Sequence, residues 1–163
     1  MKKPSHPLDK QLPILKIIVG SLIGAVIMFM VMAVVLFPFG KGDVPGGKAV
    51  LISYVALGLS GLVLLVIRPL VVTAIIRSAT RTTQVDQTGA EKHLLQTFQH
   101  CTFVEHAMLE AMCFLNLASY VAERQIWSLL VSTAIILWMV FRFPSRDRAQ
   151  RWLENHAGDE NRR

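Results

Sequence analysis

Several polar side chains that can exchange protons or bind metals lie on one predicted helix, between residues 90 and 123. Placing successive residues 100° apart puts six of them on one narrow face, with Leu117 as its one apolar member. In the middle of this face His106 and Glu110 are one turn apart, and Cys113 follows one turn later. The six residues, which we call the polar seam, are Gln99, Thr102, His106, Glu110, Cys113 and Tyr120.

Three kinds of chemistry fit the polar seam. Interhelical hydrogen bonds, each worth about 0.6–2 kcal/mol, would fix how the helix packs against its neighbours. A proton or cation relay through Glu110 and His106 is the second interpretation, because ionisable side chains inside a membrane often mark translocation paths. A metal site from His106, Glu110 and Cys113 is the third, although no other predicted membrane-spanning segment adds a His, Cys or carboxylate ligand. We expect the structural role, with the relay as its alternative, and no metal or other cofactor.

The depth of Glu110 is the reason for the relay hypothesis. If residues 98–122 cross a membrane, Glu110 lies at their midpoint, where a charge costs at least about 2.5–3.5 kcal/mol on insertion scales. We therefore expect Glu110 to be neutral at rest, to face protein or water, and to have His106 as its nearest hydrogen-bond partner. A neighbouring ridge of the same helix, about a quarter-turn away, carries Glu105, Asn116 and Glu123.

Four long apolar segments must position these residues. They cover residues 14–37, 49–67 with an extension to 76, 98–122 and 126–143, and each approaches or exceeds the roughly twenty residues that cross a hydrocarbon core. Between them the sequence predicts a Gly-rich turn at 40–48, a cytoplasmic loop at 77–89 and a cytoplasmic tail at 144–163. The predicted fold class is all-α: a four-helix transmembrane bundle that forms a single membrane domain over residues 1–163.

Basic residues are distributed unequally between the two ends of these segments. Of the 17 Lys and Arg residues, 14 lie on one side, and Lys41, Lys48 and Arg124 lie on the other. Because loops rich in Lys and Arg stay in the cytoplasm, we expect both termini there. This count requires residues 98–122 to cross, which is our main reason to treat that segment as membrane-spanning despite its polar residues.

The second apolar segment is interrupted at Arg68 and Pro69. Pro69 cannot donate a hydrogen bond to the carbonyl of Leu65, so we expect a kink there. The residues beyond it form either the end of one long helix or a short interfacial helix. Arg68 lies near the predicted cytoplasmic interface, where it is expected to pair with Glu105 or with a lipid phosphate.

Small residues predict where the first two segments meet. Gly20 and Gly24 lie four residues apart in the first segment, and Gly58 and Gly61 lie in the second. Because small residues let helix backbones approach closely, these four glycines are expected to form the contact between the two segments.

The C-terminal tail is expected to form a short helix on the membrane surface. A tryptophan on such a helix faces the apolar interior and its arginines face lipid phosphates. The residues assigned to lipid headgroups are Arg146, Arg148, Arg151 and Trp152.

Composition excludes several classes of protein. The 163 residues are 53% hydrophobic and 17% charged, which leaves too few polar residues to cover a soluble domain. The basic residues flank apolar segments instead of lying among aromatics, so no nucleic-acid partner is expected. Cys101 and Cys113 lie about 18 Å apart on one helix, too far for a disulfide. No phosphate-binding Gly loop, HExxH or G-x-S-x-G motif occurs, and we expect no enzyme.

The second half of the chain, residues 94–154, resembles a group of small uncharacterised bacterial multi-span membrane proteins. In that group a helix containing Gln-Thr leads into an ALLEG-like segment and ends near YLLE, and the last span closes with F-P-T/S-R-x-R-x-x-x-W. The matching positions here are Gln96, Thr97, Leu109, Glu110, Tyr120, Glu123, Phe143, Pro144, Arg146, Arg148 and Trp152. Ala111 stands where the group usually has Gly. The resemblance implies a multi-span helical fold and brings no known activity.

These patterns together predict a multi-pass protein of the bacterial inner membrane with an accessory, structural or complex-forming role. Its expected partners are the lipid bilayer and either a second copy or another membrane complex. The alternative is a component of proton- or cation-coupled translocation that uses Glu110.

Overall fold

The computed structural model describes residues 7–38, 51–83 and 90–152, and these residues are almost entirely helical, with no β-strand among them. The predicted turn at 40–48 and most of the predicted tail lie outside the described residues. The elements are α1 (Pro7–Leu36), α2 (Leu51–Leu62), η1 (Val63–Ile67), α3 (Arg68–Thr83), α4 (Ala90–Glu123) and α5 (Ile126–Phe141), followed by a short helix at Arg146–Trp152. The all-α class predicted from the apolar segments is confirmed.

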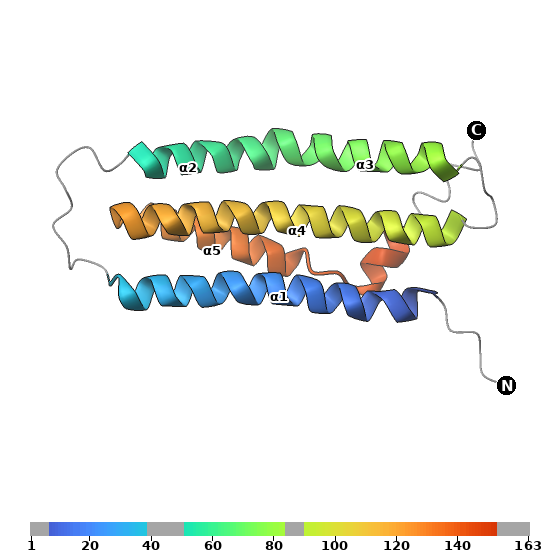
Figure 1. Cartoon of the computed structure of the whole chain (residues 1–163), viewed down its shortest axis with the longest axis horizontal. Helices are drawn as coiled ribbons and strands as arrows, with labels where there is room; N and C mark the ends of the chain where they lie inside the picture. The colour runs from blue at the N-terminus through green and yellow to red at the C-terminus, as the bar shows by residue number, and fades with distance from the viewer. Residues whose placement is uncertain (1–6, 39–50, 84–89, 153–163) are drawn as a thin grey trace.

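The helix α4 is the centre of the molecule. In Figure 1 it lies between α1 on one side and the continuous run of α2 and α3 on the other, with α5 behind it. It packs against α1, α2, α3 and α5. The 34 residues of α4 form a helix about 50 Å long. This length allows α4 to contact each of the other helices.

Two helices are long and apolar enough to cross a membrane, namely Gln11–Leu36 and Leu51–Ser78. A third candidate is α5 together with Arg146–Trp152, if that pair, bent by 75° at the break, is counted as one span. The helix α4 is long enough to cross a membrane, but its mixed composition is not apolar enough for it to count as a candidate span. The described chain therefore contains two or three candidate spans.

The interruption at Arg68 and Pro69 takes the form of a π-helical turn, η1. The N–H of Arg68 donates to the carbonyl of Val63, five residues back, instead of the usual four. This wider turn precedes Pro69, which has no N–H to donate, and the helix then continues. Residues Leu51–Ser78 thus form one long helix, which was one of the two expected alternatives. The loop predicted at 77–89 begins later than expected, because α3 extends to Thr83 along α4.

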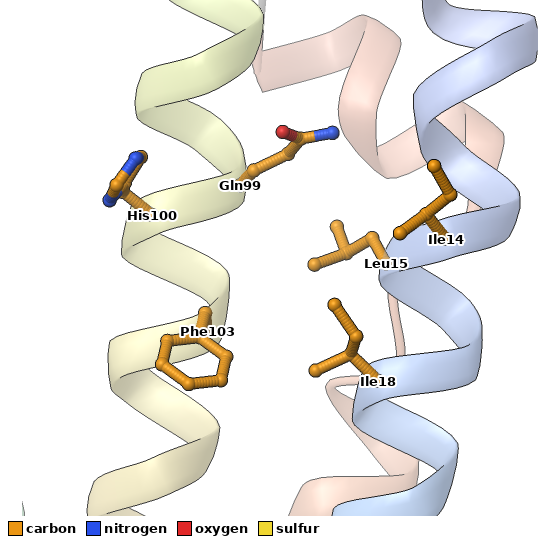
Figure 2. Close-up of a pocket in the computed structure, with 6 residues that line it drawn as sticks. All are labelled: Ile14, Leu15, Ile18, Gln99, His100 and Phe103. Atoms are coloured by element: carbon orange, nitrogen blue, oxygen red, sulfur yellow. The ribbon is translucent and has the colours of Figure 1, made fainter.

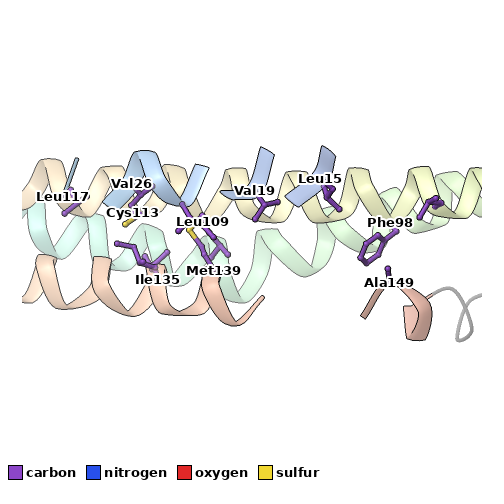
Figure 3. Packing of buried hydrophobic residues seen from close by; sticks show 13 residues of the cluster. Leu15, Val19, Val26, Phe98, Leu109, Cys113, Leu117, Ile135, Met139 and Ala149 are labelled. Atoms are coloured by element: carbon purple, nitrogen blue, oxygen red, sulfur yellow. The ribbon is translucent and has the colours of Figure 1, made fainter. Parts of the chain in front are cut away.

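The apolar core lies on the side of α4 that faces α1 and α5 (Figure 3). The fully buried members of this core include Val19 and Val26 of α1, Leu117 of α4 and Met139 of α5. Ala149 extends the same core into the C-terminal helix, where it lies near Phe98. These side chains recur at helical spacing, so each helix turns one apolar stripe inward.

Large apolar side chains also cover the outside of the helices. Met28 of α1 is 77% exposed, Leu65 is 79% exposed and Phe141 of α5 is 85% exposed. On a water-soluble monomer, exposed apolar patches rarely exceed a few hundred Å². An exterior of this kind is typical of a surface that lies in lipid.

The glycine prediction requires a correction. A Cβ added at Gly20, Gly24, Gly58 or Gly61 would meet nothing within 4 Å, so the described helices do not approach one another at these positions. The physical reason is the place of α4, which separates α1 from α2 and takes the contacts of both (Figure 1).

Candidate functional site: the polar contacts of α4

Charged side chains from three parts of the chain meet at Glu105 of α4. Arg68, the first residue of α3, donates from Nη2 to Oε1 of Glu105 and forms a salt bridge with it. Arg142, just after α5, places Nη1 at 2.9 Å from the same oxygen. The carboxylate side chain is 11% exposed, so it is largely removed from solvent while it bridges two guanidinium groups. The ion pair expected between Arg68 and Glu105 is thus present, with Arg142 as an unforeseen third member.

A cavity of about 120 Å³ opens beside this cluster. Glu105, Arg142 and Arg148 line it together with Trp152. The Nη1 of Arg148 donates to the carbonyl of Arg142 at 2.9 Å. Burial, followed by the positive charge of Arg142, lowers the pKa of Arg148, although an arginine stays protonated at any physiological pH.

The C-terminal helix is turned so that part of its polar face points into the protein. The ring of Trp152 packs against Phe98 of α4, with ring centroids 5.5 Å apart. Arg148 lines the cavity, whereas Arg146 and Arg151 are exposed. Of the residues assigned to lipid headgroups, Arg148 and Trp152 therefore contact the protein as well.

At the C-terminal end of α4, Glu123 binds the start of α2. Its Oε1 accepts a hydrogen bond from the N–H of Ile52 at 2.7 Å, and its Oε2 accepts one from the N–H of Ser53 at 2.9 Å. The first N–H groups of a helix have no partner within the helix, and a carboxylate also complements the positive end of the helix dipole. Burial would raise the pKa of Glu123, but hydrogen bonds from Ser53 and Ile52 outweigh it and lower that pKa.

The turn after Glu123 fastens this end to α1. Arg124 adopts a φ of 57°, the left-handed region that often ends a helix. Its guanidinium lies 4.3 Å from the ring centroid of Phe37, just after α1. The hydroxyl of Tyr120 donates to the carbonyl of Phe37 at 2.7 Å.

Between Glu105 and Glu123, Asn116 joins α4 to α2. Its Nδ2 donates to Oγ of Ser60 at 2.7 Å and to the carbonyl of Met112 at 2.8 Å. Ser60 in turn donates to the carbonyl of Ala56. Asn116 is buried, and Glu105, Asn116 and Glu123 all turn toward the helix that runs through α2 and α3.

The polar seam does not act as one connected row, because its members bond to different neighbours. The Nδ1 of His106 lies 2.8 Å from the carbonyl of Thr102 in the same helix, and its buried Nε2 has no hydrogen-bond partner in the described chain. Cys113 contacts α5 instead: its Sγ lies 3.5 Å from the carbonyl of Ser132. Tyr120 reaches the end of α1, as described above.

Gln99 lies at a second cavity, of about 170 Å³, between α1 and α4. Figure 2 shows its side chain extending toward Ile14 of α1, while His100 points away from α1. Leu15 and Ile18 form the α1 wall, and the lining is mostly apolar. Gln99 is therefore near α1 and separate from the charged cluster at Glu105.

Glu110 is partly exposed, and no hydrogen bond or ion pair reaches it from the residues that the structure describes. The structure shows no bond between His106 and Glu110: the Nδ1 of His106 is directed to Thr102, and its Nε2 has no partner in the described chain. In the described ranges, no three His, Cys, Asp or Glu side chains are placed to hold a metal ion.

Two sets of polar residues on α4 were noted from the sequence, the polar seam and the neighbouring ridge. The seam received the functional hypotheses, whereas the ridge of Glu105, Asn116 and Glu123 forms the bonds to the helix through α2 and α3. The spacing of this ridge, with two carboxylates about 27 Å apart on one face, was a signal that could have been weighed more heavily. The third member of the charged cluster, Arg142, had no such signal, because its pairing depends on how α5 ends against α4.

Comparison of the chain with protein-family models, curated proteins and solved structures found no match. The resemblance over residues 94–154 therefore stays a prediction.

Proposed function

We propose that this chain is a multi-pass protein of the bacterial inner membrane that crosses the bilayer four times and serves as an accessory or structural component of a membrane assembly. The observation that carries the proposal is the inversion of polarity: apolar side chains cover the outside, while Glu105, Asn116 and Glu123 of α4 bond to other helices. In lipid, buried polar groups must find partners inside the protein, and apolar surface needs no cover.

The fourth crossing depends on α4, whose composition alone does not qualify it as a span. Its polar side chains Glu105, Asn116 and Glu123 face other helices instead of lipid, which lowers the cost of placing these three groups in a bilayer. Its length exceeds the roughly 30 Å of a hydrocarbon core. The distribution of 14 of 17 basic residues supports cytoplasmic termini.

Reporter fusions test this topology. We expect a reporter fused after Arg163 to be active in the cytoplasm and one inserted between residues 42 and 46 to be active outside it. A C-terminus outside the cytoplasm would overturn the four-span topology and would make α4 a surface helix.

The accessory role rests on the nature of the contacts. The described polar bonds fix helices to one another at Glu105 in the middle of α4, at Asn116 and at Glu123 at its C-terminal end, which is what a scaffold requires. Chemical cross-linking in membranes, followed by purification in mild detergent, should recover the chain with a partner or a second copy at constant stoichiometry. A monodisperse single chain under both conditions would contradict the proposal.

A second candidate is proton- or cation-coupled translocation through Glu110. The observation in its favour is that Glu110 lies in the middle of α4 without a described partner, whereas Glu105 and Glu123 are both bonded. Reconstituted vesicles with a pH-sensitive dye test it. Flux that is present in the parent, absent in Glu110→Gln and retained in the control Asn116→Gln would favour translocation over scaffolding.

A further inference from the structure

The cavity beside Glu105 has an excess of positive charge. Arg142 and Arg148 line it, Arg68 adjoins it through Glu105, and Glu105 is the one carboxylate in the cluster. Three guanidinium groups against one carboxylate leave two positive charges without a counter-charge among these residues. A site of this kind favours an anion over a cation.

Unused donors remain around the cavity. Arg148 is bonded through Nη1 to the carbonyl of Arg142, a contact that takes one of its five N–H donors. The buried Nε of Arg68 has no hydrogen-bond partner in the described ranges. The forked geometry of a guanidinium matches two oxygens of a phosphate, so this arrangement is better suited to a phosphate than to a halide.

The walls add a second chemical character. Phe98 and Trp152, whose rings pack together, line the cavity next to the arginines. The cavity of about 120 Å³ is several times the 10–15 Å³ that one water molecule requires. Tryptophan beside arginine at a helix end is the usual combination at the headgroup level of a membrane.

We propose that this cavity binds the phosphate of an anionic phospholipid headgroup, with Arg142 and Arg148 as its ligands and Trp152 beside the glycerol region. The inference rests on the proposed topology in one respect, because that topology places the cavity at the cytoplasmic leaflet, where anionic lipids carry the surface charge. Glu105 holds Arg142 in place, and the bond from Arg148 to the carbonyl of Arg142 brings the two guanidinium groups to one site.

The test measures lipid affinity by native mass spectrometry of the full chain in neutral detergent, with phosphatidylglycerol and phosphatidylcholine as probes. The parent is expected to prefer phosphatidylglycerol, and Arg148→Gln to weaken its binding roughly tenfold, the loss expected for one charge-assisted hydrogen bond. Arg146→Gln removes the same charge from the same short helix outside the cavity lining, and is expected to weaken phosphatidylglycerol binding much less than Arg148→Gln does. Arg148→Lys keeps the positive charge but lacks the forked guanidinium, so its affinity for phosphatidylglycerol should lie between those of the parent and Arg148→Gln. If Arg148→Gln does not fold, Arg148→Lys provides the test.

Three results would overturn the proposal. Equal losses in the variants at positions 146 and 148 would indicate general surface charge, and no preference for phosphatidylglycerol would remove the site altogether. Inorganic phosphate that protects the lipid-free protein against thermal unfolding as well as phosphatidylglycerol does would assign the cavity to a soluble anion. Reporter fusions on the same variants separate this failure from a failure of the topology, because they respond to orientation and not to lipid.

Discussion

The two bonded carboxylates of α4, Glu105 and Glu123, have the same chemistry and opposite surroundings. Glu105 accepts from two guanidinium groups that come from distant parts of the chain, and a cavity lies beside it. Glu123 accepts from two backbone N–H groups at the start of one helix, and its side chain is almost fully enclosed, at 2% exposure.

Glu105 thus joins two positively charged side chains, whereas Glu123 caps the start of a helix. At Glu105 the partners are long side chains that keep further donors free, so that site retains the capacity to bind an anion. At Glu123 the partners are backbone groups that have no other role, so that end is satisfied and closed. Glu110, between them, has no described partner, which makes it a natural reference for both.

The largest effect is expected at Glu105. Glu105→Ala leaves Arg68 and Arg142 without their shared counter-charge in a partly enclosed site, and should cost about 2–3 kcal/mol of unfolding free energy, between the values for exposed and buried ion pairs. Thermal unfolding in detergent, followed by circular dichroism, measures this. A melting temperature equal to that of the parent would mean that water or detergent already satisfies the arginines, and the contrast with Glu123 would lose its basis.

Glu123→Ala should have the next largest effect, about 1–2 kcal/mol, comparable to the loss of a helix cap. Glu123→Gln keeps one acceptor oxygen and should lose about half as much. Hydrogen exchange at the start of α2 gives a local measurement, and faster exchange at Ile52 and Ser53 is expected in both variants. Unchanged exchange there would show that another group can cap α2.

The pH dependence at Glu123 follows from the direction of its shift. Because hydrogen bonds lower its pKa below the ordinary value of 4.5 in the folded protein, its contribution to stability is fully present above that value. The contribution is lost as the pH falls through the lowered pKa, since the carboxylate is then protonated in both states. The difference in melting temperature between the parent and Glu123→Gln should therefore shrink in this acid range, and a difference that grows instead would contradict the assignment.

A smaller effect is expected at Asn116, which contacts α2 without any charge. Ser60→Ala removes the acceptor of Asn116 and should cost about 0.6 kcal/mol, the average for hydrogen bonds between helices in membranes. A double-mutant cycle with Asn116→Ala isolates this bond from the one to Met112. A coupling energy of zero would show that the bond does not stabilise the interface.

The smallest effect is expected at Glu110. Since no described residue bonds to it, Glu110→Gln should change the melting temperature by less than any of the variants above. A loss as large as that at Glu105 would reveal a partner that the single chain does not contain, such as a second copy.

Much of the helical framework could be predicted from the sequence. The limits of α4, at Ala90 and Glu123, follow from its periodicity and from the polar turn that ends it, and the first residue of α5 was expected at Ile126. The pairing of Arg68 with Glu105 also had a local reason, because Arg68 follows one apolar segment and Glu105 lies about 10 Å inward from the same side of another. The end of α3 was harder to place, because residues after Ile76 are polar and only packing against α4 continues the helix.

The composition and order of residues determined that the chain is helical, that its helices carry apolar surfaces, and which polar groups α4 offers. Tertiary structure decided which of those groups have partners, because a helix presents several faces and sequence spacing does not say which neighbour meets each one. The glycines of α1 and α2 illustrate this, since their spacing permits a close contact that α4 prevents by lying between the two helices. The cluster at Glu105 illustrates it again: Arg142 follows α5, and the path of α5 along α4 brings its guanidinium to the carboxylate.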